Sequence, residues 1–292
     1  MLRALRKVLP GEFELWLALG MQGALYRDVE PATLGRVKWV DKPHLVVDIA
    51  VMPEDRKPLD LFVSVSDWGS PSVVEIGKRL GASRTVGIAG PFDELAPAEP
   101  VCHMFDRLFS VARHFDPSLT LESFASPPRF SSAAEGAAAR FVGQHLKPGE
   151  RMLFVHPETK ADKMWTREGF EFVLTRFLDR HQDVRIFLTS NEPYPLTLGA
   201  HQDRLVWVEQ HFELVMEIAR YANLFLGIDS CFLHAADLYR TPAVGLFGKS
   251  DPVDWGFRFS RRSRALWTGG KPIVGLAPEA VLEALEAVEA ER

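Results

Sequence analysis

The chain has 292 residues, which is enough for two domains of ordinary size. Apolar residues make up 47% of the sequence and charged residues 25%, the profile of a globular protein rather than a disordered one. The formal net charge of −5 gives no support to nucleic acid as the main partner.

The sequence also bears on the compartment. No apolar run approaches the length that spans a bilayer, and no secretory signal pattern is visible. Cys102 and Cys231 lie far apart and neither has another cysteine near it, so we expect two reduced thiols. We therefore expect a cytoplasmic protein.

The first half of the chain alternates helices and strands. Residue patterning predicts helices at 1–8, 73–80, 102–114 and 133–146, and strands at 13–19, 37–40, 45–51, 59–66 and 85–89. The last of these helices ends at Lys147-Pro148-Gly149, whose composition is typical of an interdomain linker. We predict a first domain at residues 1–147 and a second domain at residues 148–292.

The second half alternates more regularly. Strands are predicted at 151–156, 184–189, 224–228 and 243–247, and helices at 166–180, 212–221, after Ser230, and at 278–290. Strands and helices that alternate at these lengths predict a doubly wound parallel sheet.

The segment 224–254 is the most informative part of this half. Its first apolar run ends abruptly in Asp229-Ser230, and a short helix containing His234 follows. Ligands of open α/β sheets bind at the carboxyl ends of the strands, which is where this turn lies. A helix N-terminus suits a phosphate, with Asp229 or Ser230 as its cap. The alternatives are that both residues are only caps and that His234 is a core histidine.

Two other loops are predicted at the same edge. Residues 156–165 read HPETKADKMW and hold Thr159, Lys160 and Lys163 just before a helix, a combination that suits a diphosphate. The loop after 184–189 contains Glu192, a carboxylate that could bind the hydroxyls of a ribose or cap a helix. For the lysines, the alternative is a solvated polar loop.

Several common catalytic motifs are absent from the sequence. It contains no G-x-G-x-x-G, full Walker-type G-x-x-x-x-G-K-[ST], G-x-S-x-G or H-E-x-x-H pattern, which argues against Rossmann dehydrogenases, P-loop NTPases, serine hydrolases and zincins. The remaining interpretation is a diphosphate-binding second domain that faces the first domain across a cleft.

About a hundred residues of the second domain resemble glycosyltransferase family 9, the bacterial heptosyltransferase-like family. The family element H-P-G-x…K-x-W-P corresponds to His156-Pro157-Glu158-Thr159 and Lys163-Met164-Trp165-Thr166. The element D-[ST]-G-x-x-H-x-A-A corresponds to DSCFLHAA at 229–236. The elements T-P-x-x-x-L-F-G-x-[ST]-D-P and W-G correspond to TPAVGLFGKSDP at 241–252 and to Trp255-Gly256. The first domain matches more loosely, at 60–87 and 102–107.

The resemblance implies an α/β protein of the GT-B fold, with two Rossmann-like doubly wound domains. It implies an inverting, metal-independent transfer of a heptose or related sugar, without a cofactor. The donor would be a nucleotide diphosphate sugar, ADP-heptose-like, and the acceptor a lipopolysaccharide or another glycan or lipid-linked molecule. The residues implied to bind the donor are His156, Thr159, Lys163, Glu192, Asp229, Ser230, Cys231, Phe232 and His234. Lys163 and the N–H groups near Ser230 would stabilise the departing diphosphate.

The chain departs from the family pattern at three places. Glu158 and Cys231 replace glycines that allow close backbone approach to a ligand, and the Glu158 carboxylate is expected to repel a diphosphate. The N-terminal domain is expected to lack the family's first strand and its Gly-Asp turn, whose aspartate would be the general base. Asp67, at the end of a predicted strand, is the expected substitute base, with a helix cap as the alternative.

Two functions remain open on the sequence. The chain is either an active glycosyltransferase or a catalytically degenerate one that binds a nucleotide or glycan, or scaffolds partners, without turnover. A basic cluster at Arg258, Arg261, Arg262 and Arg264 either faces solvent or meets anionic lipid or a phosphate-bearing acceptor. The second case would place the protein peripherally on the inner membrane surface.

Overall fold

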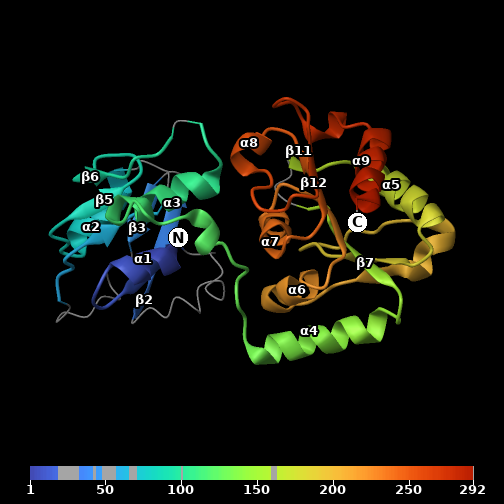
Figure 1. Cartoon of the computed structure of the whole chain (residues 1–292), viewed down its shortest axis with the longest axis horizontal. Coiled ribbons are helices and arrows are strands. Elements are labelled where there is room, and N and C mark those ends of the chain that lie inside the picture. The colour runs from blue at the N-terminus through green and yellow to red at the C-terminus, as the bar shows by residue number, and fades with distance from the viewer. Residues whose placement is uncertain are drawn as a thin grey trace. The chain divides into compact units, whose positions relative to one another are not determined.

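The computed structural model describes residues 1–18, 33–41, 44–47, 57–65, 71–99, 101–158 and 163–291. The chain divides into two compact units, Met1–Arg129 and Phe130–Arg292 (Figure 1). Linker composition predicts a boundary after residue 147, but the division falls earlier. The reason is that α4 (Ser132–His145) packs against α6 (Phe212–Ala219), so α4 goes with the second unit.

The first unit contains two small sheets among its described residues. One has the order β1 (Glu14–Ala18), β2 (Thr33–Asp41) and β3 (His44–Val47), with β1 and β2 parallel and β3 antiparallel to β2. The other has the order β4 (Phe62–Val63), β5 (Thr85–Gly87) and β6 (Glu94–Leu95), all parallel. Of the predicted strand at 59–66, the described residues form a strand only at Phe62–Val63.

Three α-helices accompany these sheets in the described part of this unit, and their bounds follow the predicted pattern. They are α1 (Leu2–Val8), α2 (Pro71–Arg79) and α3 (Met104–Phe115). His103 caps α3, since its Nδ1 accepts the N–H of Phe105 at 3.2 Å. The helix buries Phe109 completely, so the predicted helix at 102–114 is confirmed as a core element of this unit.

The second unit is built on one six-stranded parallel sheet. Across the sheet the order is β9 (Leu205–Trp207), β8 (Val184–Leu188), β7 (Arg151–His156), β10 (Leu224–Ile228), β11 (Ala243–Phe247) and β12 (Ser263–Trp267). Numbered along the chain, this is the 3-2-1-4-5-6 order of doubly wound nucleotide-binding sheets. The strand order reverses between β7 and β10, which makes the carboxyl ends of these two strands the expected ligand site.

Helices cover the sheet of the second unit. Besides α4 and α6 these are α5 (Arg167–Arg180), α7 (Cys231–Tyr239), α8 (Pro252–Trp255) and α9 (Pro278–Ala290). Helix α5 packs on α9, and α6 packs on both α4 and α7. Every residue of β10 and β11 is buried, as expected for parallel strands that are covered on both faces. No helix in the described part of the chain is long and apolar enough to cross a membrane.

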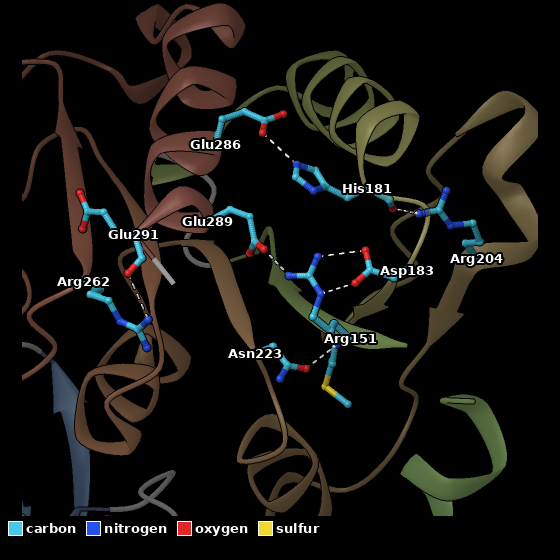
Figure 2. Close-up of polar contacts among 10 residues, drawn as sticks. Arg151, His181, Asp183, Arg204, Asn223, Arg262, Glu286, Glu289 and Glu291 are labelled. Carbon is cyan, nitrogen blue, oxygen red and sulfur yellow. Dashed lines mark hydrogen bonds and ion pairs between the residues drawn. The ribbon is translucent and has the colours of Figure 1, made fainter. Parts of the chain in front are cut away.

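The amino ends of the strands carry a polar network (Figure 2). Arg151, the first residue of β7, donates to Asp183 at 2.5 and 2.9 Å and also contacts Glu289 of α9. His181 pairs with Glu286 of the same helix at 2.8 Å. These contacts fasten α9 to the amino edge of the sheet.

Arg204 closes the end of α5 at this edge. Its guanidinium donates to the carbonyl oxygens of Leu178 at 3.0 Å and Val184 at 2.7 and 3.0 Å, and to that of His181. The last carbonyls of a helix have no partner within the helix, and this buried arginine supplies one. Arg204 therefore fixes the turn from α5 into β8.

Candidate functional site

Three loops of the second unit meet at the carboxyl ends of β7, β10 and β11. Lys163 follows β7, Asp229 follows β10 and Ser250 follows β11. The Lys163 ammonium donates to Asp229 Oδ2 at 2.6 Å and to Ser250 Oγ at 2.7 Å. The Ser250 hydroxyl in turn donates to Asp229 Oδ2 at 2.6 Å. These three residues form a closed set of hydrogen bonds at the point where the strand order reverses.

Burial differs between the two charged members of this set. The Asp229 side chain is 10% exposed, whereas that of Lys163 is 30% exposed. The lysine therefore neutralises a mostly buried carboxylate and still presents part of its ammonium group to solvent. Its charge and its remaining donor capacity are available to an anion, since an ammonium group carries three donors.

The start of α7 lies directly beside Asp229. Ser230 occupies the capping position, but its hydroxyl makes no capping bond, and its Oγ is buried without a hydrogen-bond partner among the described residues. The first N–H groups of a helix have no intrahelical acceptor. A buried hydroxyl without a partner next to such N–H groups is a site that lacks an acceptor, and an oxyanion would provide it.

His234 and Cys231 lie on the same helix. His234 Nε2 is 3.9 Å from Asp229 Oδ1, and its ring lies 6.2 Å from that of Trp255 on α8. Cys231 is the first residue of α7 and is exposed. The structure thus brings Lys163, Asp229, Ser230, Cys231 and His234 together.

His156 and Phe232 lie beneath this edge rather than on it. His156, at the end of β7, is 5% exposed, and its Nδ1 is 2.9 Å from the carbonyl oxygen of Thr189. Phe232 is buried against it, with ring centroids 4.6 Å apart. Burial lowers the pKa of His156 to about 4, so its ring is neutral near pH 7. His156 joins the ends of β7 and β8 and carries no charge for a phosphate.

Glu158 and Glu192 meet at the loop after β8. Glu158 Oε2 accepts the N–H of Asn191 at 2.5 Å and the N–H of Glu192 at 3.3 Å. The Glu192 side chain itself is exposed. The carboxylate that was expected to repel a diphosphate is therefore turned onto the backbone of the neighbouring loop.

Two predicted site residues, Thr159 and Asp67, lie outside the described residues. Trp165 of the resemblance motif is a core residue, because it is 3% exposed and its Nε1 donates to the carbonyl oxygen of Leu276 at 3.1 Å. Within the described parts of the chain, no three or more histidine, cysteine or acidic side chains are grouped to hold a metal ion.

Two residues that the sequence did not single out have clear structural roles. Ser250 is the hydroxyl of the S-D-P motif, and that motif was the signal for it. Asp237 on α7 is fully buried, and its carboxylate accepts the N–H groups of Arg258, Phe259 and Ser260 at 3.0, 2.9 and 2.7 Å. Only its place in an apolar helix face could have indicated this role.

Comparisons with known proteins identify the family and the fold of the chain. Residues 72–275 match the sequence profile of glycosyltransferase family 9 (heptosyltransferase). No curated protein sequence matches the chain.

Solved structures match over nearly the whole chain. The chain is similar to a glycosyl transferase family 9 protein from Veillonella parvula DSM 2008, with a TM-score of 0.72, 14% identity and coverage of 100% of this chain and 92% of that chain. It is similar to E. coli heptosyltransferase WaaC with ADP-2-deoxy-2-fluoro heptose, with a TM-score of 0.67, 16% identity and coverage of 98% of this chain and 94% of that chain. It is also similar to E. coli ADP-heptose lps heptosyltransferase II, with a TM-score of 0.64, 14% identity and coverage of 99% of this chain and 93% of that chain. These likenesses show the α/β fold of the GT-B heptosyltransferases.

Proposed function

The chain belongs to glycosyltransferase family 9, and on that premise we propose that it transfers a heptose or related sugar from a nucleotide diphosphate donor to a glycan acceptor. The observation that carries the proposal is the hydrogen-bonded set of Lys163, Asp229 and Ser250 beside the N-terminus of α7. A lysine ammonium and helix N–H groups together suit a diphosphate.

The charges of the site fit a leaving diphosphate. Asp229 alone would repel it, and the ion pair with Lys163 removes most of that repulsion. The Ser230 hydroxyl and the first N–H groups of α7 then act as neutral donors aimed at the same edge. As the bond from the sugar to the diphosphate breaks, the growing negative charge meets donors that are already in place.

The remaining residues have supporting roles in the proposal. Glu192 binds the ribose hydroxyls, and Thr159 adds a hydroxyl to the phosphates. Cys231 and His234 line the pocket on α7, while His156 and Phe232 hold its floor. A nucleotide of the ADP-heptose kind is the favoured donor, because the solved E. coli relatives hold ADP and an ADP-heptose analogue.

The transfer step would be an inverting displacement without a metal. The acceptor hydroxyl attacks the anomeric carbon as the bond to the diphosphate breaks, and the hydroxyl proton passes to a carboxylate, for which Asp67 remains the proposed base. A lipopolysaccharide or another lipid-linked glycan is the proposed acceptor. The place of action would be the cytoplasm, with the inner membrane surface as a peripheral site.

The basic cluster offers less positive charge to a membrane surface than its four arginines indicate. Arg264 pairs with Glu291, and Arg262 donates to the Glu291 carbonyl oxygen at 3.4 Å. Two of the four cations are thus held by the end of α9.

Calorimetry with ADP, GDP, UDP and CDP tests the donor site. Lys163→Ala should raise the dissociation constant of the best nucleotide roughly 10- to 100-fold, because a charge-assisted hydrogen bond is lost. Lys147→Ala, which removes an exposed lysine before β7, is the matched control and should change nothing. Unchanged affinity in Lys163→Ala would refute the assignment.

Turnover separates the enzyme from its degenerate alternative. Release of the nucleoside diphosphate from a nucleotide heptose, dependent on a glycan acceptor, is expected of the active protein. Tight nucleotide binding without any release would favour the binding protein instead.

A further inference from the structure

Glu158 makes an unexpected contact for a residue at a family glycine position. It is the second residue after β7, and its carboxylate reaches the loop after the neighbouring strand β8. Oε2 accepts two successive backbone N–H groups, those of Asn191 and Glu192, at 2.5 and 3.3 Å. A glycine has no side chain to make this contact.

The same loop is held from a second direction. The Ser190 hydroxyl donates to the carbonyl oxygen of Glu192 at 2.5 Å. The N–H and the C=O of Glu192 are therefore both occupied, while its side chain is exposed at the carboxyl edge of the sheet. A backbone fixed in this way sets the point from which the Glu192 side chain reaches a ligand, which lowers the ordering cost of binding.

We propose that Glu158 is a positioning residue that sets the affinity for the ribose of the nucleotide donor by fixing the backbone of Glu192. The inference rests on the proposed function, in which Glu192 binds the ribose hydroxyls. The Glu158 carboxylate accepts hydrogen bonds from two backbone N–H groups, and hydrogen bonds to a charged acceptor are stronger than neutral ones. Glu158 thus acts on the ribose and not on the diphosphate.

The positioning role and electrostatic repulsion predict opposite changes in nucleotide affinity when Glu158 is removed. If Glu158 faced the diphosphate, its removal would tighten binding. If it holds the ribose loop, its removal weakens binding, and only for ligands that have ribose hydroxyls. Inorganic pyrophosphate and a 2′,3′-dideoxynucleoside diphosphate are therefore the informative probes.

The experiment compares wild type, Glu158→Ala and Glu158→Gln by calorimetry. The probes are whichever of ADP, GDP, UDP and CDP binds wild type best, its 2′,3′-dideoxy analogue and pyrophosphate. Glu158→Ala should weaken the nucleotide roughly 5- to 30-fold and leave the other two probes within about two-fold of wild type. Glu158→Gln keeps a neutral acceptor oxygen and should lie between the two proteins.

A double-mutant cycle gives the second readout. Glu192→Ala should weaken the same nucleotide, and Glu158→Ala should add little in the Glu192→Ala background, because the two residues act through one contact. Thermal denaturation of each variant confirms that the fold is retained. A loss in Glu158→Ala that persists fully without Glu192 would overturn the inference.

Three further outcomes are decisive. Tighter nucleotide binding by Glu158→Ala would establish repulsion and overturn the inference alone. Equal weakening of all three probes would show general disruption of the loop and also overturn it. A wild-type protein that binds no nucleoside diphosphate would overturn the proposed function, and the inference with it.

Discussion

Lys163 and Asp229 form an ion pair at 2.6 Å although 66 positions separate them in the sequence. Each follows a different strand, and the two strands are neighbours only because the sheet order reverses between them. The pair is thus a direct product of the topology. It also means that the anion site holds a compensated charge before a ligand binds.

Asp229→Asn should tighten the binding of a nucleoside diphosphate about 10-fold. The Lys163 charge that Asp229 neutralises becomes available to the ligand, and a unit charge about 5 Å from a phosphate charge is worth roughly 3 kcal/mol at an effective dielectric constant of about 20. Asparagine still accepts a hydrogen bond from Lys163, and the weakening of that bond costs roughly 1.5 kcal/mol, so the gained attraction wins. Calorimetry at low and high salt checks this, and weaker binding at both would show that the aspartate mainly holds the lysine.

Ser250→Ala should weaken the same binding about five-fold. The Ser250 hydroxyl accepts from Lys163 and donates to Asp229, so its loss frees the lysine to adopt other rotamers. Ser250→Thr keeps the hydroxyl and is the matched control, with affinity close to wild type. Equal affinities in all three proteins would show that Asp229 alone positions Lys163.

Asp237→Ala should lower the free energy of unfolding by about 3 kcal/mol or more. Three backbone N–H groups at 258–260 lose their buried acceptor, and each unsatisfied donor costs about 1 kcal/mol or more. Urea unfolding measures the change, with the exposed Asp203→Ala as a control near zero. A loss below about 1 kcal/mol would mean that solvent reaches these donors.

Acid should destabilise the protein through His156. Burial lowers its pKa to about 4, whereas the unfolded chain titrates at the ordinary value of 6.5. The unfolded state therefore binds the proton more readily. The contribution of His156 to the stability of the folded state is complete above pH 6.5 and is lost as the pH falls toward 4. At 1.36 kcal/mol per pKa unit, the loss is at most about 3 kcal/mol.

His156→Gln tests this titration, since glutamine can still donate to the Thr189 carbonyl oxygen. Urea unfolding between pH 7.5 and 4 should show a shallower decline in stability for the variant than for wild type. Parallel declines in the two proteins would assign the acid sensitivity to other groups.

The buried strands of the second unit were predictable from the sequence. The bounds of β7, β10 and β11 are confirmed, because each strand is built on a short apolar run. The edge strand β12 was not predicted. Its sequence SRALW is half exposed and begins beside several arginines, so no hydrophobic pattern marks it.

The site was predictable at the level of loops but not of side-chain directions. Asp229 and Lys163 were expected at one edge, because the carboxyl ends of parallel strands meet there. The contact of Glu158 with the backbone of Asn191 depends on the distance between two loops, which the sequence does not show. The burial of His156 under Phe232 depends on tertiary packing in the same way.

The network of Figure 2 lies at the amino ends of the strands whose carboxyl ends carry Lys163 and Asp229. A five-residue strand such as β10 spans roughly 16 Å, beyond the distance at which substitutions usually couple. Changes at the two ends should therefore combine additively. Directed evolution can therefore first select stabilising substitutions at the amino ends of the strands. The added stability then offsets the destabilising effect of substitutions that alter donor preference at the carboxyl ends.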